Sequence, residues 1–458
     1  MLVKLLRAMD RGEFEPTVVT LVNDGALIEV VRDMGIEVQS LDLRRGEVSP
    51  RALRRLVTIL RGTRPDLVQS WMYHSNVAAS LARPWLPRRT GIVWNIRQSL
   101  YDITKERYLT QAVIRSGRVL APHADAMVNN SRVSSAQHAR IGYANRRSLV
   151  IPNGFEVASF KPDPAARSSF RAELGVADDA IVAGIVARVH PSKDHALFFR
   201  AAEAAAARNP RLAFVCAGHG TNTHERCREA ARGPLKGRLH LLGERVDVPR
   251  VMAGLDILVS SSATEGCPNA VGEGMACGLA VIGTDSGDTA DVIGDAGRIV
   301  PCGDTERLAT AVSEVSRMGA TERALLGEAA RERIRRLYAI ETVAARYAHR
   351  VDALPELVGD ADWIALVLPD TPDTRGVISR EILARCRNAV LLNAGRGSVV
   401  DESAIPEALD QGWLRGAALD VFTVEPLPSH SPLWRDPRVL ISPHSSGPST
   451  VDATADGF

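Results

Sequence analysis

Two cations near the middle of the chain have the types and spacing to hold a diphosphate. Arg188 and Lys193 follow an apolar run at residues 180–188 that predicts a buried parallel strand. Open α/β sheets bind ligands beyond the carboxyl ends of their strands, where both side chains would lie. A guanidinium and an ammonium there could neutralise a departing nucleoside diphosphate without a metal ion. The spacing alone fits equally well two solvated cations on a surface loop.

Two glutamates, Glu265 and Glu273, stand further along with seven residues between them. The pattern predicts Glu265 in a loop and Glu273 inside a helix that begins near Pro268 and ends at Gly278. Backbone N–H groups at residues 267–270 would then form an anion site able to hold the same phosphates. Glu273, one turn into the helix, could accept hydrogen bonds from ribose hydroxyls.

Alternating helices and short strands must position these residues. A helix at 1–9, a strand at 16–22 and a helical segment at 25–34 open the chain. Ser49 as N-cap and Pro50 as first residue mark the next helix start. Four apolar runs ending in polar residues predict parallel strands with loops at their carboxyl ends: 66–70, 91–95, 126–130 and 148–152.

Two more series of strands and helices follow. The second has predicted strands at 180–188, 212–217, 239–242, 257–260 and 280–283. A helical run at 321–354 would close this domain or cross back onto the first. The third has predicted strands at 363–368, 389–393, 416–421 and 439–442. We expect an α/β protein with two Rossmann-like doubly wound domains, at 1–150 and 151–354, and a partial third Rossmann-like unit at 355–458.

Composition limits the classes of function. The 458 residues exceed the size of a single core, about 250–300 residues, so two or three domains are expected. A net charge of +2 with both signs interspersed gives no evident field for nucleic acid, and we expect no such partner. The six cysteines form no C-x-x-C pair or zinc-ligand cluster, which indicates reduced thiols and no metal site.

Hydropathy predicts where the protein works. No apolar run reaches the roughly 18 residues that suggest a membrane-spanning helix, and Met1 opens directly onto an amphipathic helix pattern. We therefore expect a cytoplasmic protein that is soluble or at most peripheral at the inner face of the membrane.

In combination, the motifs of the first two domains resemble group 1, retaining glycosyltransferases of the two-Rossmann-domain type. The resemblance covers residues 1 to about 354. Its motifs are Ile151-Pro-Asn-Gly154-Phe155, the Arg188/Lys193 pair, Gly218-His219-Gly220, Leu242-Gly-Glu-Arg-Val-Asp247 and the Glu265/Glu273 pair. The resemblance implies the glycosyltransferase B-type fold and catalysis of sugar transfer from a nucleotide sugar.

The resemblance also implies roles for these side chains. Arg188 and Lys193 would contact the donor diphosphate, Glu265 the donor sugar hydroxyls and Glu273 the ribose. His74, in the first domain, matches a position that approaches the sugar. On its own, a lone His after a strand is more often structural than catalytic.

The remaining donor contacts follow in the same way. Arg245 and Val246 would lie near the base. Backbone groups complete the expected donor site: Gly218, Gly220, Pro268, Asn269 and Ala270. The family's favoured mechanism is front-face attack, in which the leaving phosphate helps deprotonate the acceptor hydroxyl, so positioning and charge stabilisation would supply most of the rate. No cofactor is expected for the transfer, because the nucleotide sugar is a substrate.

The amino end departs from the family pattern. Members begin with a strand and a glycine-rich loop, commonly ending Gly-Gly-Ala-Glu, before the helix that here occupies residues 1–9. That loop normally lies beside the donor phosphates and the acceptor. We therefore expect an N-terminally truncated transferase with reduced activity, whose first sheet lacks a normally central strand.

The last hundred or so residues resemble the NAD-binding domain of D-2-hydroxyacid dehydrogenases of the glyoxylate/hydroxypyruvate reductase sort. Three motifs carry the match: Leu368 to Gly376, Leu392-Asn-Ala-Gly-Arg396-Gly and Leu419-Asp-Val-Phe-Thr-Val-Glu425-Pro. No G-x-G-x-x-G turn precedes Trp363 and no substrate domain is present, so we expect weak NAD(P) binding, if any. The chain then joins two fragments near 355–362, and the sequence leaves open a natural fusion, a frameshift or an assembly error.

This second resemblance implies a catalytic set of its own. Arg396 would pair with the substrate carboxylate, and His444 would exchange the proton on the substrate hydroxyl. Glu425 would hold His444 charged and oriented, and Asp420 would lie near the nicotinamide.

Three functions are therefore compared. The first is a glycosyltransferase that moves a hexosyl group, with retention, from a nucleoside diphosphate sugar to a saccharide or lipid-linked acceptor in cell-surface polysaccharide synthesis. The alternative is an NAD(P)-dependent 2-hydroxyacid oxidoreductase, carried by the C-terminal fragment and expected to be inactive. The third is a nucleotide-binding or assembly module without turnover.

Overall fold

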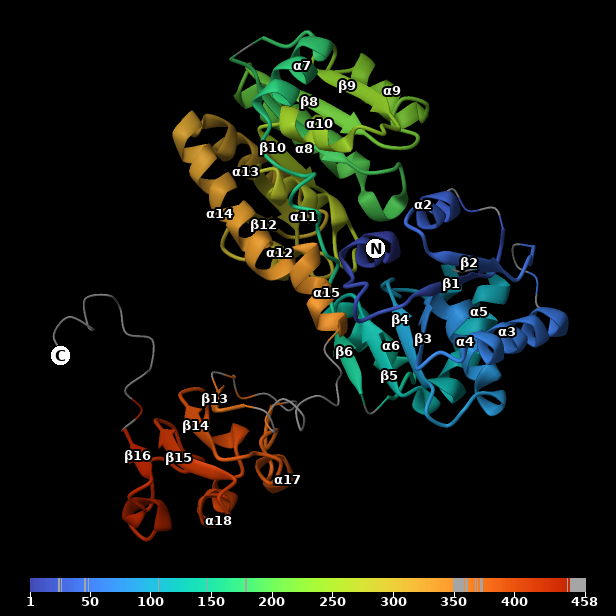
Figure 1. Cartoon of the computed structure of the whole chain (residues 1–458). Coiled ribbons are helices and arrows are strands. Elements are labelled where there is room, and N and C mark those ends of the chain that lie inside the picture. Colours follow the sequence, from blue (N-terminus) through green and yellow to red (C-terminus); the bar gives the residue numbers. More distant parts are fainter. Residues whose placement is uncertain are drawn as a thin grey trace. The chain divides into compact units, whose positions relative to one another are not determined.

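The chain folds into two compact α/β units, Met1–Ala348 and His349–Phe458 (Figure 1). The computed structural model describes residues 1–348 except 24, 26, 45, 46, 48, 106, 146 and 178. Beyond these it describes residues 358–444 except 359, 360, 367, 369, 371–373 and 443. The expected domain boundary at 354/355 lies outside the described residues, as do four residues of the motif from Leu368 to Gly376.

The first 150 residues hold two separate parallel sheets. The smaller one pairs β1 (Thr17–Thr20) with β2 (Glu37–Ser40), flanked by α1 (Leu2–Ala8) and α2 (Leu27–Asp33). The sequence did not predict β2, because Val38 is the only apolar side chain among its four residues. The larger sheet has the order β3-β4-β5-β6 and consists of β3 (Leu67–Trp71), β4 (Gly91–Ile96), β5 (Ala126–Asn129) and β6 (Ser148–Val150).

Four helices complete this region: α3 (Pro50–Thr63), α4 (Met72–Ala82), α5 (Tyr108–Leu120) and α6 (Arg132–Arg140). Pro50 is the first residue of α3, as predicted. Ser49 has the extended backbone of an N-cap, but its side chain makes no capping hydrogen bond, which corrects part of that prediction. Trp94 and Ile114 are fully buried between the larger sheet and α5.

The next series forms a six-stranded parallel sheet in the order β12-β11-β10-β7-β8-β9. Its strands are β7 (Ile181–Val186), β8 (Leu212–Ala217), β9 (Leu239–Gly243), β10 (Ile257–Ser260), β11 (Ala280–Thr284) and β12 (Arg298–Val300). The first five were predicted, and the three-residue β12 was not. The chain order reverses between β7 and β10, and such a reversal opens a crevice at the carboxyl ends of the two strands.

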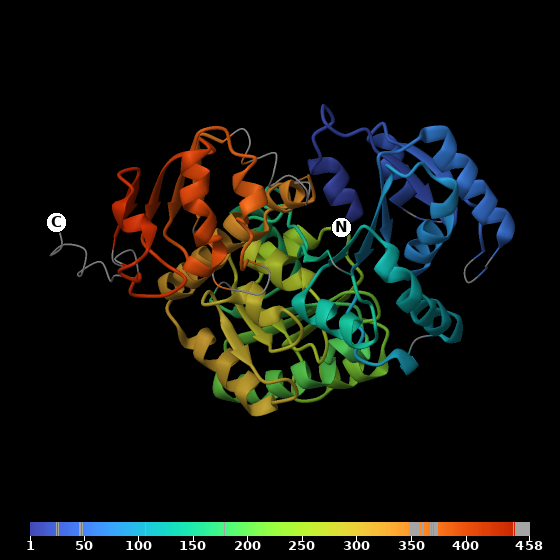
Figure 2. The same cartoon turned by 90° about the horizontal axis from the view of Figure 1, so that it is seen from below.

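Helices cover both faces of this sheet (Figures 1 and 2). They are α7 (Pro164–Leu174), α8 (His195–Arg208), α9 (Glu225–Arg232), α10 (Val248–Gly254), α11 (Asn269–Ala276), α12 (Thr289–Ile293) and α13 (Thr305–Arg317). Phe198 and Phe214 are buried in the core under α8 and α13, and Phe155 and Phe170 in the core on the opposite face. The helix predicted between Pro268 and Gly278 is confirmed as α11, with Pro268 as N-cap.

The helical run after residue 320 is two helices and not the single run that the sequence predicted. α14 (Ala320–Tyr338) and α15 (Ile340–Ala348) are separated at Ala339, whose extended backbone forms a β-bridge with Phe155. α14 packs on α11 and closes the second domain. α15 crosses back onto the first, where the Tyr347 hydroxyl accepts hydrogen bonds from Asn95 (3.1 Å) and Arg97 (2.8 Å). Both predicted roles of this segment are therefore found.

The second unit is a four-stranded parallel sheet in the order β13-β14-β15-β16. Its elements are β13 (Trp363–Leu366), α17 (Arg380–Leu383), β14 (Ala389–Asn393), α18 (Ile405–Asp410), β15 (Leu414–Leu419) and β16 (Val439–Ile441). β15 begins and ends two residues earlier than the predicted strand at 416–421, so Asp420 follows the strand instead of lying within it.

We predict that Gly327→Ala destabilises the first unit. A Cβ at this position of α14 would lie 1.9 Å from the backbone oxygen of Gly278, just after α11. Backbone cannot yield as a side chain does, and overpacking of this kind costs about 1–3 kcal/mol. Calorimetry should show a lower Tm for the first unit. Gly319→Ala, at the N-cap of α14, is the control, because its Cβ would meet nothing within 4 Å. Equal Tm values for both variants would contradict the packing of α14 on α11.

Candidate functional site

The two loops at the topological reversal carry an ion pair. Lys193 follows β7, Glu265 follows β10, and the Lys193 ammonium contacts Oε1 of Glu265. Ser262 donates a second hydrogen bond to the same oxygen, at 2.7 Å. The Glu265 side chain is only 11% exposed, so this carboxylate is directed by its partners and not by solvent. The structure therefore brings together two of the residues that the sequence singled out.

Main-chain contacts fix the two loops to each other. The Ser261 hydroxyl donates to the carbonyl oxygens of Lys193 (2.9 Å) and Asp194 (3.0 Å). The Ala263 N–H donates to the Ser192 carbonyl at 2.8 Å. The Lys193–Glu265 pair thus rests on a backbone frame that spans both strands.

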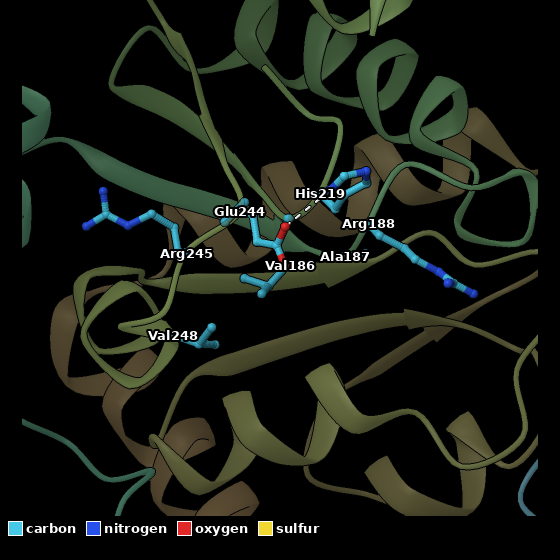
Figure 3. A pocket seen from close by; sticks show the side chains of 9 residues that line it. Val186, Ala187, Arg188, His219, Glu244, Arg245 and Val248 are labelled. Carbon is cyan, nitrogen blue, oxygen red and sulfur yellow. Dashed lines mark hydrogen bonds and ion pairs between the residues drawn. The ribbon is translucent and has the colours of Figure 1, made fainter. Parts of the chain in front are cut away.

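A pocket of about 460 Å³ opens at the carboxyl ends of β7, β8 and β9. Its lining residues are Val186, Ala187, Arg188, Ala217, Gly218, His219, Glu244, Arg245 and Val248. In Figure 3 the Arg188 and Arg245 side chains extend from opposite sides of the pocket, with Glu244 and His219 between them. His219 Nδ1 lies 3.2 Å from Glu244 Oε2. A second, smaller space of about 20 Å³ is lined by Lys193, Glu265, Pro268 and Ala270, and shares Val186 and Ala187 with the larger pocket.

Glycine is required where β8 meets this pocket. Gly218 has a φ of +139°, and a Cβ there would lie 2.2 Å from the Ala187 carbonyl oxygen and 2.8 Å from the Arg188 nitrogen. Gly220 has a φ of +86°, and its Cβ would lie 3.3 Å from Val189. The absence of a side chain lets the Gly218 loop touch the backbone that carries Arg188.

Arg245 is held in a carboxylate network at the rim of the larger pocket. It donates to Asp247 at 2.8 Å and to Glu173 at 2.9 Å. Hydrogen bonds from Arg245 lower the pKa of Asp247 to about 2, and the carboxylates raise the pKa of Arg245 in turn. Val246 is fully exposed and lies outside the pocket lining. Arg245 is thus positioned at the pocket, whereas a role for Val246 stays a prediction.

The start of α11 contacts the junction between the two domains. Asn269 accepts a hydrogen bond from the side-chain amide of Asn153 at 2.7 Å. The same amide donates to the Cys267 carbonyl at 3.3 Å, and Asn153 also accepts a hydrogen bond from Arg97. The Asn153 motif therefore holds the helix end at which we expect an anion.

Glu273 lies in neither pocket lining. Its carboxylate Oε1 is 3.3 Å from the ammonium of Lys4, on α1. Burial raises the pKa of Glu273, and Lys4 opposes that shift. No local pattern connects Lys4 with Glu273, because 268 residues lie between them in the sequence.

Groups of the first domain hold the loop of Glu265. The Tyr101 hydroxyl donates to the Glu265 carbonyl at 3.0 Å. Asp288, after β11, accepts hydrogen bonds from the backbone N–H groups of Arg132 (2.7 Å) and Val133 (3.1 Å) at the start of α6. The Asp288 N–H donates to the Gly266 carbonyl at 2.9 Å. Tyr101 and Asp288 were not predicted as residues of the site, because neither belongs to a recognisable motif.

His74 is exposed on the first turn of α4. Among the described residues it makes no hydrogen bond or ion pair, and it does not line the two pockets described above. Its approach to a donor sugar stays a prediction.

The second unit holds an acid–base pair of its own. His444 Nδ1 lies 2.7 Å from Glu425 Oε2, and the Phe422 N–H donates to Glu425 Oε1 at 2.9 Å. The hydrogen bond with His444 is the largest cause that lowers the pKa of Glu425. The structure thus brings together the Glu425 and His444 that the sequence predicted to act as a pair.

The other two predicted residues of this unit, Arg396 and Asp420, have hydrogen bonds of their own, and the charge of Asp420 acts on the Glu425 carboxylate. Arg396 is exposed and donates to the Gly395 carbonyl at 2.8 Å. Its loop touches the Glu425 loop, because a Cβ on Gly397 would lie 1.9 Å from the Phe422 carbonyl carbon. Asp420 is 7% exposed at the end of β15 and accepts a hydrogen bond from Ser442. Within the described part of 358–444, no G-x-G-x-x-G turn follows a strand, so these residues do not fit the diphosphate of NAD.

The described part of the chain contains neither a candidate metal site nor a candidate membrane-spanning helix. It contains no group of three or more His, Cys, Asp or Glu side chains arranged to hold a metal ion. None of its helices combines the length and apolar character needed to cross a bilayer.

Family models match three stretches of the chain. Residues 1–154 match the glycosyl transferase 4-like domain, and residues 180–317 match glycosyl transferases group 1. Residues 331–446 match the NAD binding domain of D-isomer specific 2-hydroxyacid dehydrogenases. The third match begins inside α14, although residues 331–348 pack with the first unit.

Curated relatives match about a hundred residues of the chain. Glyoxylate/hydroxypyruvate reductase B of Pectobacterium carotovorum subsp. carotovorum (strain PC1) is 46% identical over 100 residues, which are 22% of this chain and 31% of that protein. D-3-phosphoglycerate dehydrogenase of Mycobacterium tuberculosis (strain CDC 1551 / Oshkosh) is 41% identical over 111 residues, 24% of this chain and 21% of that protein. The chain therefore spans less than a third of the length of these relatives.

Solved structures match the first unit. Anabaena Alr3699/HepE in complex with UDP and glucose has a TM-score of 0.63 at 22% identity, over 76% of this chain and 93% of that one. Sucrose-phosphate synthase from Thermosynechococcus elongatus has a TM-score of 0.60 at 18% identity, over 76% of this chain and 90% of that one. At these identities the likeness shows a shared fold, the expected glycosyltransferase B-type arrangement.

We predict that Gly218→Ala displaces the loop that carries Arg188. Amide hydrogen exchange of residues 187–193 should become faster, because the added Cβ collides with backbone. Gly237→Ala is the matched control: its φ of +75° imposes the same kind of strain, but its Cβ would meet nothing within 4 Å. Unchanged exchange in Gly218→Ala would show that this close contact does not hold the loop.

Proposed function

Because the chain joins group 1 glycosyltransferase domains to a D-2-hydroxyacid dehydrogenase NAD-binding domain, we propose that its first unit transfers a hexosyl group from a nucleoside diphosphate sugar, with retention. The observation that carries this proposal is the Lys193–Glu265 pair at the reversal of strand order, beside the pocket of Arg188. The similar Anabaena structure, in complex with UDP and glucose, supports a donor of this class.

In this proposal the diphosphate contacts three positive groups. Lys193 and Arg188 bind its oxygens, and the N–H groups of Asn269 and Ala270, which follow the N-cap Pro268 at the start of α11, donate to the same anion. Gly218 and Gly220 let the chain approach the donor closely. Charge that develops on the leaving phosphate is stabilised where it forms, which lowers the barrier to bond cleavage.

The sugar and nucleoside contact the carboxylates and the pocket rim. Glu265 accepts hydrogen bonds from the sugar hydroxyls, and Lys193 keeps that carboxylate in place. Glu273 accepts from the ribose, while Arg245 and Val246 flank the base. His74 approaches the sugar from the first domain. The leaving phosphate takes the proton of the acceptor hydroxyl as that oxygen attacks the same face, which retains the anomeric configuration.

We place the domains of this enzyme at residues 1–150, 151–354 and 355–458. The acceptor is a saccharide or a lipid-linked saccharide, and the process is synthesis of a cell-surface polysaccharide in the cytoplasm. The transfer needs no cofactor, because the donor carries its own activated bond.

Loss of the Lys193–Glu265 ion pair should strongly lower the rate of transfer. Release of nucleoside diphosphate from a panel of UDP-, GDP- and ADP-sugars should fall by about a hundredfold in kcat/KM for Lys193→Ala and Glu265→Ala, as removal of one stabilising group in an active site does. Lys236→Ala and Glu229→Gln, at exposed positions of the same domain, should leave the rate unchanged. Turnover that persists in both site variants would exclude the proposal.

A basic surface on the first domain supports peripheral membrane association. Between residues 50 and 90 the sequence holds eight arginines and one acidic residue. Trp85 is 53% exposed in this stretch, followed by the exposed Arg88 and Arg89. The Thr90 hydroxyl donates to the Pro65 carbonyl at 3.0 Å, so this segment lies beside the end of α3. Arginines bind anionic lipid headgroups, and tryptophan favours the membrane interface.

Vesicle binding tests this association. Arg88→Ser with Arg89→Ser should weaken binding to phosphatidylcholine vesicles containing phosphatidylglycerol by about thirtyfold, because each of the two cations near such a surface contributes about 1 kcal/mol. The control pair is Arg335→Ser with Arg336→Ser, two adjacent exposed arginines on α14. Equal binding by the two double variants would contradict the assignment of the surface.

The Glu425–His444 contact favours a second candidate function, reduction of small 2-oxo acids. Here Arg396 would bind the substrate carboxylate, Asp420 would lie near the nicotinamide of NAD(P), and His444 would donate the proton. Oxidation of NADPH with glyoxylate or hydroxypyruvate, abolished by His444→Asn, would support it. We expect no oxidation, because no G-x-G-x-x-G turn follows a strand in the described part of residues 358–444.

A further inference from the structure

The amino-terminal helix places a cation against Glu273. The Lys4 ammonium lies 3.3 Å from Glu273 Oε1 and 3.9 Å from Glu156 Oε2. The three side chains are 21%, 17% and 23% exposed, respectively, so this is not a solvated surface pair. Lys4 lies on α1, Glu273 on α11, and Glu156 on the segment that follows β6. The contact therefore joins the first domain to the second.

Aromatic rings surround the same ammonium. Lys4 Nζ lies 6.0 Å from the ring centroid of Phe155 and 5.8 Å from that of Phe160. A cation at this distance is attracted to a ring face, and the attraction grows as water is excluded. Leu5 and Leu6 are buried and anchor the helix. Lys4 is therefore held in place independently of Glu273.

α11 cannot adjust its own position to direct Glu273. A Cβ on Gly272 would lie 2.1 Å from the Phe155 ring, and one on Gly274 would lie 2.4 Å from Leu258. Both neighbours of Glu273 are thus packed without free space. The direction of the carboxylate depends on its side-chain torsions, and Lys4 is the cation that contacts it. In Figures 1 and 2 the amino-terminal helix α1, dark blue, lies between the smaller sheet of β1 and β2 and helix α15.

We propose that Lys4 is a positioning residue that directs the Glu273 carboxylate toward the ribose hydroxyls of the donor. This inference rests on the proposed function, because it assumes that a nucleotide binds beside α11. One Glu273 oxygen pairs with Lys4, which leaves the other lone pairs of the carboxylate to accept hydrogen bonds from a diol. Donor affinity then depends on the contact between α1 and the second domain, so the first domain takes part in donor recognition.

The charges around Glu273 give a second, independent readout. Burial raises its pKa, Lys4 and the Met1 amino group oppose that shift, and Glu156 adds to it. The thiol of Cys277 also faces it, with a pKa raised to about 12, and stays neutral. Loss of Lys4 removes the main opposing charge. The pH below which ribonucleotide binding weakens should therefore move upward.

The experiment is calorimetric titration of the full chain with UDP, GDP and ADP, and with the 2′,3′-dideoxy form of the tightest binder. Lys4→Met should weaken the ribonucleotide by about tenfold, the effect of one charge-assisted contact, and leave the dideoxynucleotide unchanged. Lys4→Arg should restore most of the affinity. Arg7→Gln is the matched control, because Arg7 lies one turn along the same helix and contacts Glu156 but not Glu273. Lys4→Gln replaces Lys4→Met if the latter does not fold.

Lys4→Met should also have no further effect in a Glu273→Gln background, because the two residues act through one contact. Equal loss for the ribonucleotide and dideoxynucleotide, additivity with Glu273→Gln, or no loss in Lys4→Met would overturn the inference and leave the proposed function standing. If the wild-type chain binds none of the three nucleotides, the proposed function fails, and the inference fails with it.

Discussion

The contact between an ammonium and a carboxylate at the reversal of strand order organises the first unit. Lys193 and Glu265 stand on loops after β7 and β10, strands that pair in parallel although 70 residues separate the end of β7 from the start of β10. A carboxylate and an ammonium removed from water are stable only when each has a partner. The hydrogen bonds from Ser262 and Ser261 complete that pairing and tie it to the backbone. The site is consequently a preformed arrangement of charge at the edge where such sheets bind ligands.

The first domain contributes to this arrangement from three directions. Tyr101 and the start of α6 hold the loop that carries Glu265, the latter through Asp288. Arg97 donates to the Ile151 carbonyl at 3.0 Å and to Tyr347 at 2.8 Å, and so connects the larger sheet to the junction and to α15. Burial lowers the pKa of Arg97, and hydrogen bonds from its two terminal nitrogens replace part of the lost water. These contacts from the first domain therefore help to hold the loop that carries Glu265.

Local sequence patterns predicted most of the strands and the proximity of the loops that follow β7 and β10, but not the contacts between domains. Glu265 and Lys193 could be assigned to one edge, because parallel strands bring their carboxyl ends together. Lys4 could not be connected with Glu273, since hydrophobic periodicity carries no information on which surface faces which. The break at Ala339 also escaped prediction, because Ala has a high helix propensity and only the pairing with Phe155 imposes the extended backbone. In the second unit the Glu425–His444 contact was predictable from motif resemblance, whereas the role of Arg396 stays a prediction.

The central claim is that the charged groups at the ends of β7 and β10 share one ligand, a nucleoside diphosphate. A crystal structure of the chain with bound UDP tests this most directly. If the proposed site is correct, the diphosphate oxygens will lie within hydrogen-bonding distance, about 3 Å, of the Lys193 ammonium and the first N–H groups of α11. The Arg188 side chain will also contact these oxygens. A nucleotide bound elsewhere, with Lys193 and Glu265 still paired only with each other, would contradict it.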